Sequence, residues 1–112
     1  MRTFWLCDDN GELLRARGPL ALPTEVWTHL YRTVLPREQW PNLRRLWREQ
    51  WGPEAETHLT PEDVDALARE LESLALFVDS DTPEEVLAFL DDLATLCVIG
   101  SAKRLGITVE AD

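Results

Sequence analysis

The chain has 112 residues, a hydrophobic fraction of 45% and a formal net charge of −10. This length fits a single domain over residues 1–112 with one hydrophobic core, and the composition is typical of a soluble globular protein rather than a disordered one. No apolar run approaches the roughly 20 residues of a membrane helix, and the N-terminus has no secretory signal, so we expect a cytoplasmic protein without membrane association.

The first third of the chain predicts a hairpin followed by a helix. "TFWLC" at residues 3–7 is typical of a strand, "DDNG" supplies turn residues, and "ELLRAR" at residues 12–17 is predicted to return beside the first strand. "GPLALP" at residues 18–23 is interpreted as a connection. Thr24 is then expected to cap a helix over residues 25–35.

The stretch "QWPNLRRLWREQW" at residues 39–51 contains three of the five tryptophans. Pro41 suits a first helical position, and the apolar spacing predicts a helix that continues to Trp51, before a Gly-Pro pair. On such a helix Trp40, Trp47 and Trp51 lie close to one line.

Three interpretations of this tryptophan-rich helix remain open. The indoles pack in the core while the arginines point outward, or the helix forms a protein interface, since Trp and Arg are enriched in binding hot spots. The interface residues would be Trp47, Trp51, Arg44 and Arg48. Nucleic-acid binding is the third interpretation, but a net charge of −10 repels a polyanion, and no nucleic-acid partner is expected.

The second half predicts two helices and a final strand. Residues 54–59 are interpreted as an acidic linker or a short extended piece. "TPED" at residues 60–63 and "DTPEE" at residues 81–85 are helix-start signals. The second of these helices is apolar on all sides around "LCVIG" at residues 96–100, which predicts deep burial there, and Gly100 is expected to permit a close neighbour.

The chain ends in an alternating strand, "ITVEA" at residues 107–111, and Gly106 before it is expected to cap the last helix. The order of these elements predicts an α+β fold. A small three-stranded sheet, made of the N-terminal hairpin and the C-terminal strand, is expected to pack against about four α-helices, with the first strand at its centre.

The charge is distributed unevenly along the chain. Residues 1–52 hold 8 basic and 6 acidic residues, a balance of +2, whereas residues 53–112 hold 3 basic and 15 acidic residues, a balance of −12. The spacing of these acids predicts that they lie along helix faces: Glu62, Asp63, Asp65, Glu70, Glu72, Asp91 and Asp92. They form a solvated face that aids solubility, a docking surface for a basic protein, or a carboxylate metal site. The metal site has the least support, because no loop shows the alternating Asp/Asn and Gly spacing of a calcium-binding loop.

Catalytic and metal-binding signals are weak. Cys7 and Cys97 are predicted to be buried thiols, with a long-range disulfide or a reactive thiol as the alternative, and the two histidines belong to no ligand cluster. Glu25 and His29 are spaced as neighbours on one helix and form a surface pair or an acid/base dyad. Because no phosphate loop, nucleophile elbow or HExxH motif occurs, we assign no catalytic residue, metal or cofactor.

Residues 58–112 show a pattern of helix starts and apolar spacing in two segments, "HLTPEDVDALARELESL" and "FLDDLATLCVIGSAKRLGITVEAD". This pattern of helix starts and apolar spacing resembles small acidic bacterial proteins of immunity or uncharacterised type. The resemblance implies binding of a partner toxin, often a basic nuclease, and it transfers no functional residue.

We therefore expect a small acidic bacterial interaction protein, in particular an immunity-type inhibitor, that binds a basic protein through Glu62, Asp63, Asp65, Glu70, Asp91 and Asp92. A homodimeric structural or regulatory module that uses residues 40–51 is the alternative, and a small enzyme ranks third.

Overall fold

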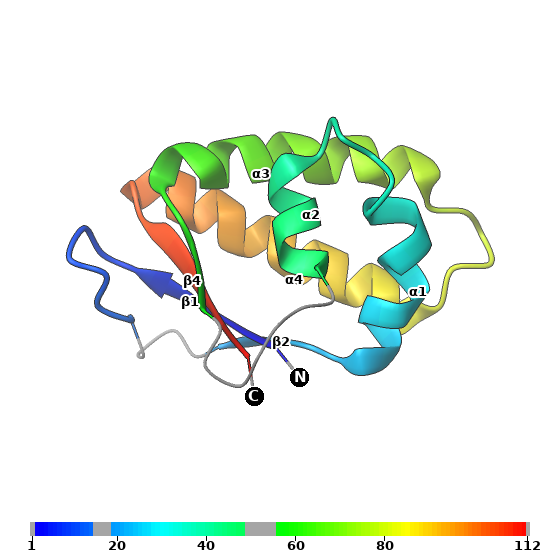
Figure 1. Ribbon diagram of the computed structural model, residues 1–112, viewed down its shortest axis with the longest axis horizontal. Helices are drawn as coiled ribbons and strands as arrows, with labels where there is room; N and C mark the ends of the chain where they lie inside the picture. The colour runs from blue at the N-terminus through cyan, green and yellow to red at the C-terminus, as the bar shows by residue number, and fades with distance from the viewer. Residues whose placement is uncertain (1, 15–18, 49–55, 112) are drawn as a thin grey trace.

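The computed structural model describes residues 2–14, 19–48 and 56–111. Within these residues it has four helices and an antiparallel four-stranded sheet of order β2-β1-β4-β3, with the helices on one side of the sheet (Figure 1). The strands are β1 Arg2–Cys7, β2 Leu20–Leu22, β3 Glu56–Leu59 and β4 Gly106–Ala111. The helices are α1 Thr24–Val34, α2 Pro41–Trp47, α3 Pro61–Leu74 and α4 Glu84–Lys103, and a 3-10 turn, η2 Ala75–Phe77, follows α3. The α+β class is confirmed, although the sheet has four strands rather than three.

The centre of the sheet is the pair formed by the first and last strands, as predicted. β1 runs antiparallel to β4 along its whole length, from the pair Arg2↔Ala111 to the pair Cys7↔Gly106. The side chain of Phe4 is 0% exposed and meets the ring of Phe89 on α4 at a centroid distance of 5.9 Å. The central strands therefore provide the floor on which the helices pack.

The predicted N-terminal hairpin is wrong in its second strand. β1 pairs on its outer side with β2, which lies in the segment interpreted as a connection, and Leu13 makes only an isolated bridge to Cys7. Residues 15–18 lie outside the described residues. The observed pairing buries Leu22 to 1% exposure. Pro23 follows β2 directly, and a proline, which has no N–H group, is tolerated there because β2 is an edge strand with no further strand on its outer side.

β3 is the fourth strand, found where a linker or short extended piece was expected. It pairs antiparallel with β4 and buries Leu59 completely. Gly106 lies in β4 opposite this strand, and a Cβ atom there would be 2.4 Å from the Leu59 carbonyl oxygen. The expectation that Gly106 caps α4 is therefore wrong: Arg104 is the left-handed residue at the helix end, with φ 54°.

α3 begins at the predicted "TPED" signal, with Thr60 as its N-cap, whereas α1 begins one residue earlier than predicted. Thr60 Oγ1 accepts from the Asp63 N–H at 3.2 Å, while Asp63 Oδ2 accepts from the Thr60 N–H at 3.1 Å, forming a capping box. α1 instead starts after Pro23, so Thr24 is its first residue and not its cap.

α4 confirms one expectation and bears out another only in part. A Cβ atom at Gly100 would lie 3.3 Å from Val64 Cγ1 and 3.4 Å from Leu6 Cδ2, so this glycine does allow α3 and the sheet to approach closely. The deep burial predicted around "LCVIG" holds on one side of the helix only, because Cys97 is 0% exposed and Gly100 is buried, whereas Val98 is 65% exposed. One side of α4 meets α1, α3 and the sheet, and its opposite side is open.

The tryptophan-rich stretch belongs to the core in the described chain. Trp40 is 2% exposed and Trp47 is 0% exposed, and the Trp47 indole N–H donates to the Trp27 carbonyl at 3.1 Å. α2 ends at Trp47 and does not continue as predicted, and Trp51 lies outside the described residues. Among the described residues, no helix has the length and apolarity needed to cross a membrane.

We expect Gly106→Ala to lower the free energy of unfolding by about 1–3 kcal/mol, because its Cβ would collide with the backbone of β3. Urea denaturation measures the loss. Gly100→Ala is the matched control: its Cβ would meet side-chain ends, and alanine raises helix propensity by about 1 kcal/mol. Equal losses in the two variants would contradict this account of Gly106.

Candidate functional site

The open side of α4 combines exposed acidic and exposed apolar side chains. We call this set the α4 outer face, and it consists of Leu87, Ala88, Asp91, Asp92, Thr95, Val98 and Ala102, all of them exposed. The spacing of three, four and seven residues places these positions on one half of the helix circumference. The α4 outer face is therefore one continuous surface along the helix.

Two large apolar side chains on this face are exposed to solvent. Val98 is 65% exposed and Leu87 is 39% exposed, three helical turns apart. A helix that is apolar on all sides is normally covered all round, whereas α4 is covered on one side only. Exposed apolar area rimmed by polar residues is a common property of interaction surfaces.

Asp91 and Asp92 lie on this face, as their position in the sequence predicts. In residues 2–14, 19–48 and 56–111, neither carboxylate takes part in an ion pair, and the same holds for Glu84 and Glu85 in the first turn of α4. The first-turn acids also lie at the positive end of the helix dipole, which favours a negative charge there. α4 thus presents acidic groups that contacts within the chain do not neutralise.

The predicted acids at the start of α3 have internal partners. The Arg104 guanidinium contacts Glu62 at 3.3 Å and Asp65 at 3.0 Å, and the Ser101 hydroxyl donates a hydrogen bond to Asp65. The hydrogen bonds from Ser101 and Arg104 lower the pKa of Asp65 below its usual value. These carboxylates join the first turns of α3 to the end of α4.

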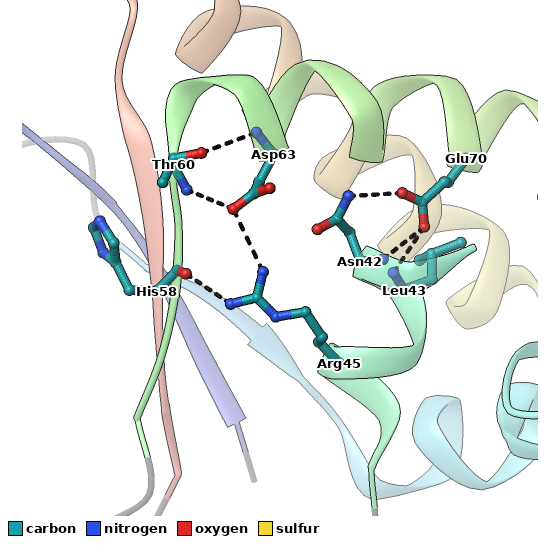
Figure 2. Close-up of polar contacts among 7 residues, drawn as sticks. All are labelled: Asn42, Leu43, Arg45, His58, Thr60, Asp63 and Glu70. Atoms are coloured by element: carbon teal, nitrogen blue, oxygen red, sulfur yellow. Dashed lines mark hydrogen bonds and ion pairs between the residues drawn. The ribbon is translucent and has the colours of Figure 1, made fainter. Parts of the chain in front are cut away.

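Asp63 has two roles in the fold. Besides capping α3, its Oδ2 lies 3.4 Å from Arg45 Nη1, and Arg45 Nη2 donates to the His58 carbonyl at 2.9 Å (Figure 2). The same arginine therefore connects α2 with the end of β3 and the start of α3. Asp63 is half-buried and is less available to a partner than Asp91 or Asp92.

Glu70 does not lie on the acidic surface where the sequence places it. It is 6% exposed, and its Oε1 accepts from the backbone N–H groups of Asn42 and Leu43, both at 3.0 Å. Its Oε2 accepts from Asn42 Nδ2 at 2.8 Å (Figure 2). Glu70 therefore caps the N-terminus of α2 across the boundary with α3, and its predicted partner contact is replaced by a structural role.

Of the proposed interface residues in the tryptophan-rich stretch, the three that the structure describes, Arg44, Trp47 and Arg48, do not gather on a surface. Trp47 is fully buried, and the Arg44 Nε–H donates to the Leu35 carbonyl at 2.9 Å. Arg48 is exposed, and its carbonyl accepts from Arg2 Nη2 at 2.7 Å. In the described chain this region offers individual arginines and no exposed indole patch.

A shallow hollow of about 320 Å³ lies between the start of α2 and α3. It is lined by Gln39, Trp40, Pro41, Ala66, Arg69, Glu70 and Ser73. The Glu70 carboxylate in this hollow already accepts the α2 donors and is not available to a ligand. Glu25 and His29 are exposed on α1 and do not line it. No cluster of three or more His, Cys, Asp or Glu side chains suited to a metal occurs among the described residues.

Sequence reasoning found Asp91 and Asp92 but missed Leu87 and Val98 as parts of the same surface. The available signal was the apolar character of α4 on all sides, which was interpreted as burial within the chain. The chain matches no protein-family model, no curated protein and no solved structure. Function is therefore inferred from the α4 outer face itself.

We expect Glu70→Gln to lower the free energy of unfolding by about 1–3 kcal/mol, since an amide nitrogen would replace one carboxylate oxygen and leave a buried donor without its acceptor. Glu72→Gln, an exposed change on the same helix, is the control and should stay within about 0.5 kcal/mol of the wild type. Chemical denaturation of both variants compares them. A Glu70→Gln protein as stable as the control would show that the cap does not hold α2.

Proposed function

We propose that this chain is a small protein-interaction module whose α4 outer face binds a basic segment of a partner protein. The observation that carries the proposal is the presence of Asp91 and Asp92, without ion pairs in the described chain, beside the exposed side chains of Leu87 and Val98. The formal net charge of −12 over residues 53–112 adds a negative electrostatic field to that of Asp91 and Asp92.

The two kinds of side chain on the α4 outer face would act differently on binding. The carboxylates attract a positively charged partner over a distance and raise the association rate. Leu87 and Val98, separated by about 16 Å along the helix axis, contribute apolar contacts once the partner is in place. An amphipathic basic helix, with apolar side chains flanked by Lys or Arg, has the matching chemistry.

The specific form of this proposal is an immunity-type inhibitor that neutralises a basic toxin such as a nuclease. The acidity of the chain and the resemblance of residues 58–112 support it. A homodimer built on residues 40–51 has less support, because Trp47 is buried within its own chain. An enzyme has the least support, since Glu25 and His29 are exposed away from the hollow beside α2.

The proposal is tested with Asp91→Lys/Asp92→Lys, which reverses two charges on the α4 outer face. The wild-type chain, immobilised, should retain a basic protein from lysate of the native host at low salt and release it at high salt. Against this protein, once purified, the variant should associate at least about tenfold more slowly, because steering is lost. Stopped-flow association at several ionic strengths gives the rates.

The matched control is Asp9→Lys/Glu12→Lys, which makes the same net charge change at the exposed turn after β1. It should associate nearly as fast as the wild type. A second variant, Val98→Ser, should raise the dissociation rate and leave the association rate unchanged. A partner that binds the α4 charge reversal at the wild-type rate, without salt dependence, would rule out the proposed surface.

A further inference from the structure

Three side chains from neighbouring strands meet on the sheet face opposite the helices. They are Cys7 of β1, Thr108 of β4 and His58 of β3, which lie 50 to 101 residues apart in the chain. Thr108 Oγ1 is 3.3 Å from Cys7 Sγ and 3.2 Å from His58 Nδ1, and the sulfur is 3.7 Å from the same imidazole nitrogen. The three polar atoms form a nearly equilateral triangle.

The strand register explains this meeting. His58 and Thr108 are directly paired across β3 and β4, and Cys7 is paired with Gly106, two residues before Thr108 on the same face. A Cβ atom at Gly106 would lie 3.3 Å from the Cys7 sulfur and 3.6 Å from His58 Cε1. The glycine therefore leaves the space in which the thiol and the imidazole come together.

The cluster is sealed on one side and open on the other. Cys7 is 0% exposed and Thr108 is 3% exposed, whereas His58 is exposed and its ring points away from α3 (Figure 2). The imidazole is thus the boundary between the buried sulfur and solvent.

We propose that Cys7, His58 and Thr108 form one face of a binding site for a single thiophilic metal ion, Zn²⁺ or Cu⁺. Zinc–sulfur and zinc–imidazole bonds of about 2.3 and 2.0–2.1 Å at a tetrahedral angle place sulfur and nitrogen about 3.6 Å apart, close to the 3.7 Å observed. The Thr108 hydroxyl is nearly equidistant from both atoms and is the third, weaker ligand.

Binding replaces the thiol proton by the metal. The S–H bond breaks, a sulfur–metal bond forms and the proton leaves to water, while His58 binds through a deprotonated Nδ1 and carries its proton on Nε2. Thiolate and imidazole together suit soft or borderline ions. A single ion fits among these three atoms, whereas an organic substrate would have to reach a sulfur that is 0% exposed.

The test is titration of the reduced, full-length protein under anaerobic conditions. Cd²⁺ serves as the spectroscopic probe for the Zn²⁺ arm, through its sulfur-to-metal charge-transfer absorbance, and competition with a chromogenic Cu⁺ chelator serves the Cu⁺ arm. We expect one ion per chain in at least one arm. Cys7→Ser should abolish the absorbance, and His58→Gln should weaken affinity at least about tenfold, since even outer-shell changes cost 10–100-fold.

Cys97→Ser is the matched control. Cys97 is as buried as Cys7, but among the described residues no imidazole or hydroxyl lies within hydrogen-bond distance of its sulfur. Burial, with a contribution from the Glu70 charge, raises the pKa of the Cys97 thiol to about 12. The control should bind like the wild type. Circular dichroism checks the fold, and His58→Gln changes an exposed side chain, so it tests the site even if Cys7→Ser unfolds.

Two results would overturn the site. Charge-transfer absorbance that persists in Cys7→Ser and disappears in Cys97→Ser would assign the metal to the other thiol. Absence of binding to the wild type in both arms would show that the three side chains form a structural hydrogen-bonded cluster only.

Discussion

The carboxylate of Glu70 fixes the arrangement of the helices. α2 has only seven residues, too few to be stable alone in water, so its position depends on contacts with the rest of the fold. Glu70 accepts the first N–H groups of α2 from across the boundary with α3, and a buried carboxylate is tolerated there because both its oxygens are hydrogen-bonded. With α2 held in this way, Trp40 and Trp47 enter the core.

Hydrogen bonds and ion pairs within the fold also divide the acidic residues of α3 and α4 into two groups. Glu70 caps α2, and Asp63 caps α3. Asp65 joins the start of α3 to the end of α4 through its hydrogen bonds with Ser101 and Arg104. Their charge is partly compensated by fixed donors, so little of it remains for a partner. Asp91 and Asp92 have no such donors among the described ion pairs, so their charge remains available to a partner that meets α4.

The sequence predicted what local chemistry decides. The Thr60 capping box, the helix start at Pro41 and the alternating last strand depend on residues close together in the chain. β2 and β3 have three and four residues, and they form because β1 and β4 offer free edges, which short sequences do not reveal. Glu70 looked like any acid on a helix surface, since its partners on α2 are 27 and 28 residues away.

β4 links the two surfaces on which function is proposed. Its side chains alternate, so Ile107 and Val109 enter the core beneath the helices while Thr108 meets Cys7 and His58 on the opposite face. The core of α3, α4 and the sheet lies between that cluster and the α4 outer face. Because exposed side chains on opposite sides of a packed core share no contacts, substitutions at Asp91 and at His58 should act independently, and each surface can be tested while the other stays intact.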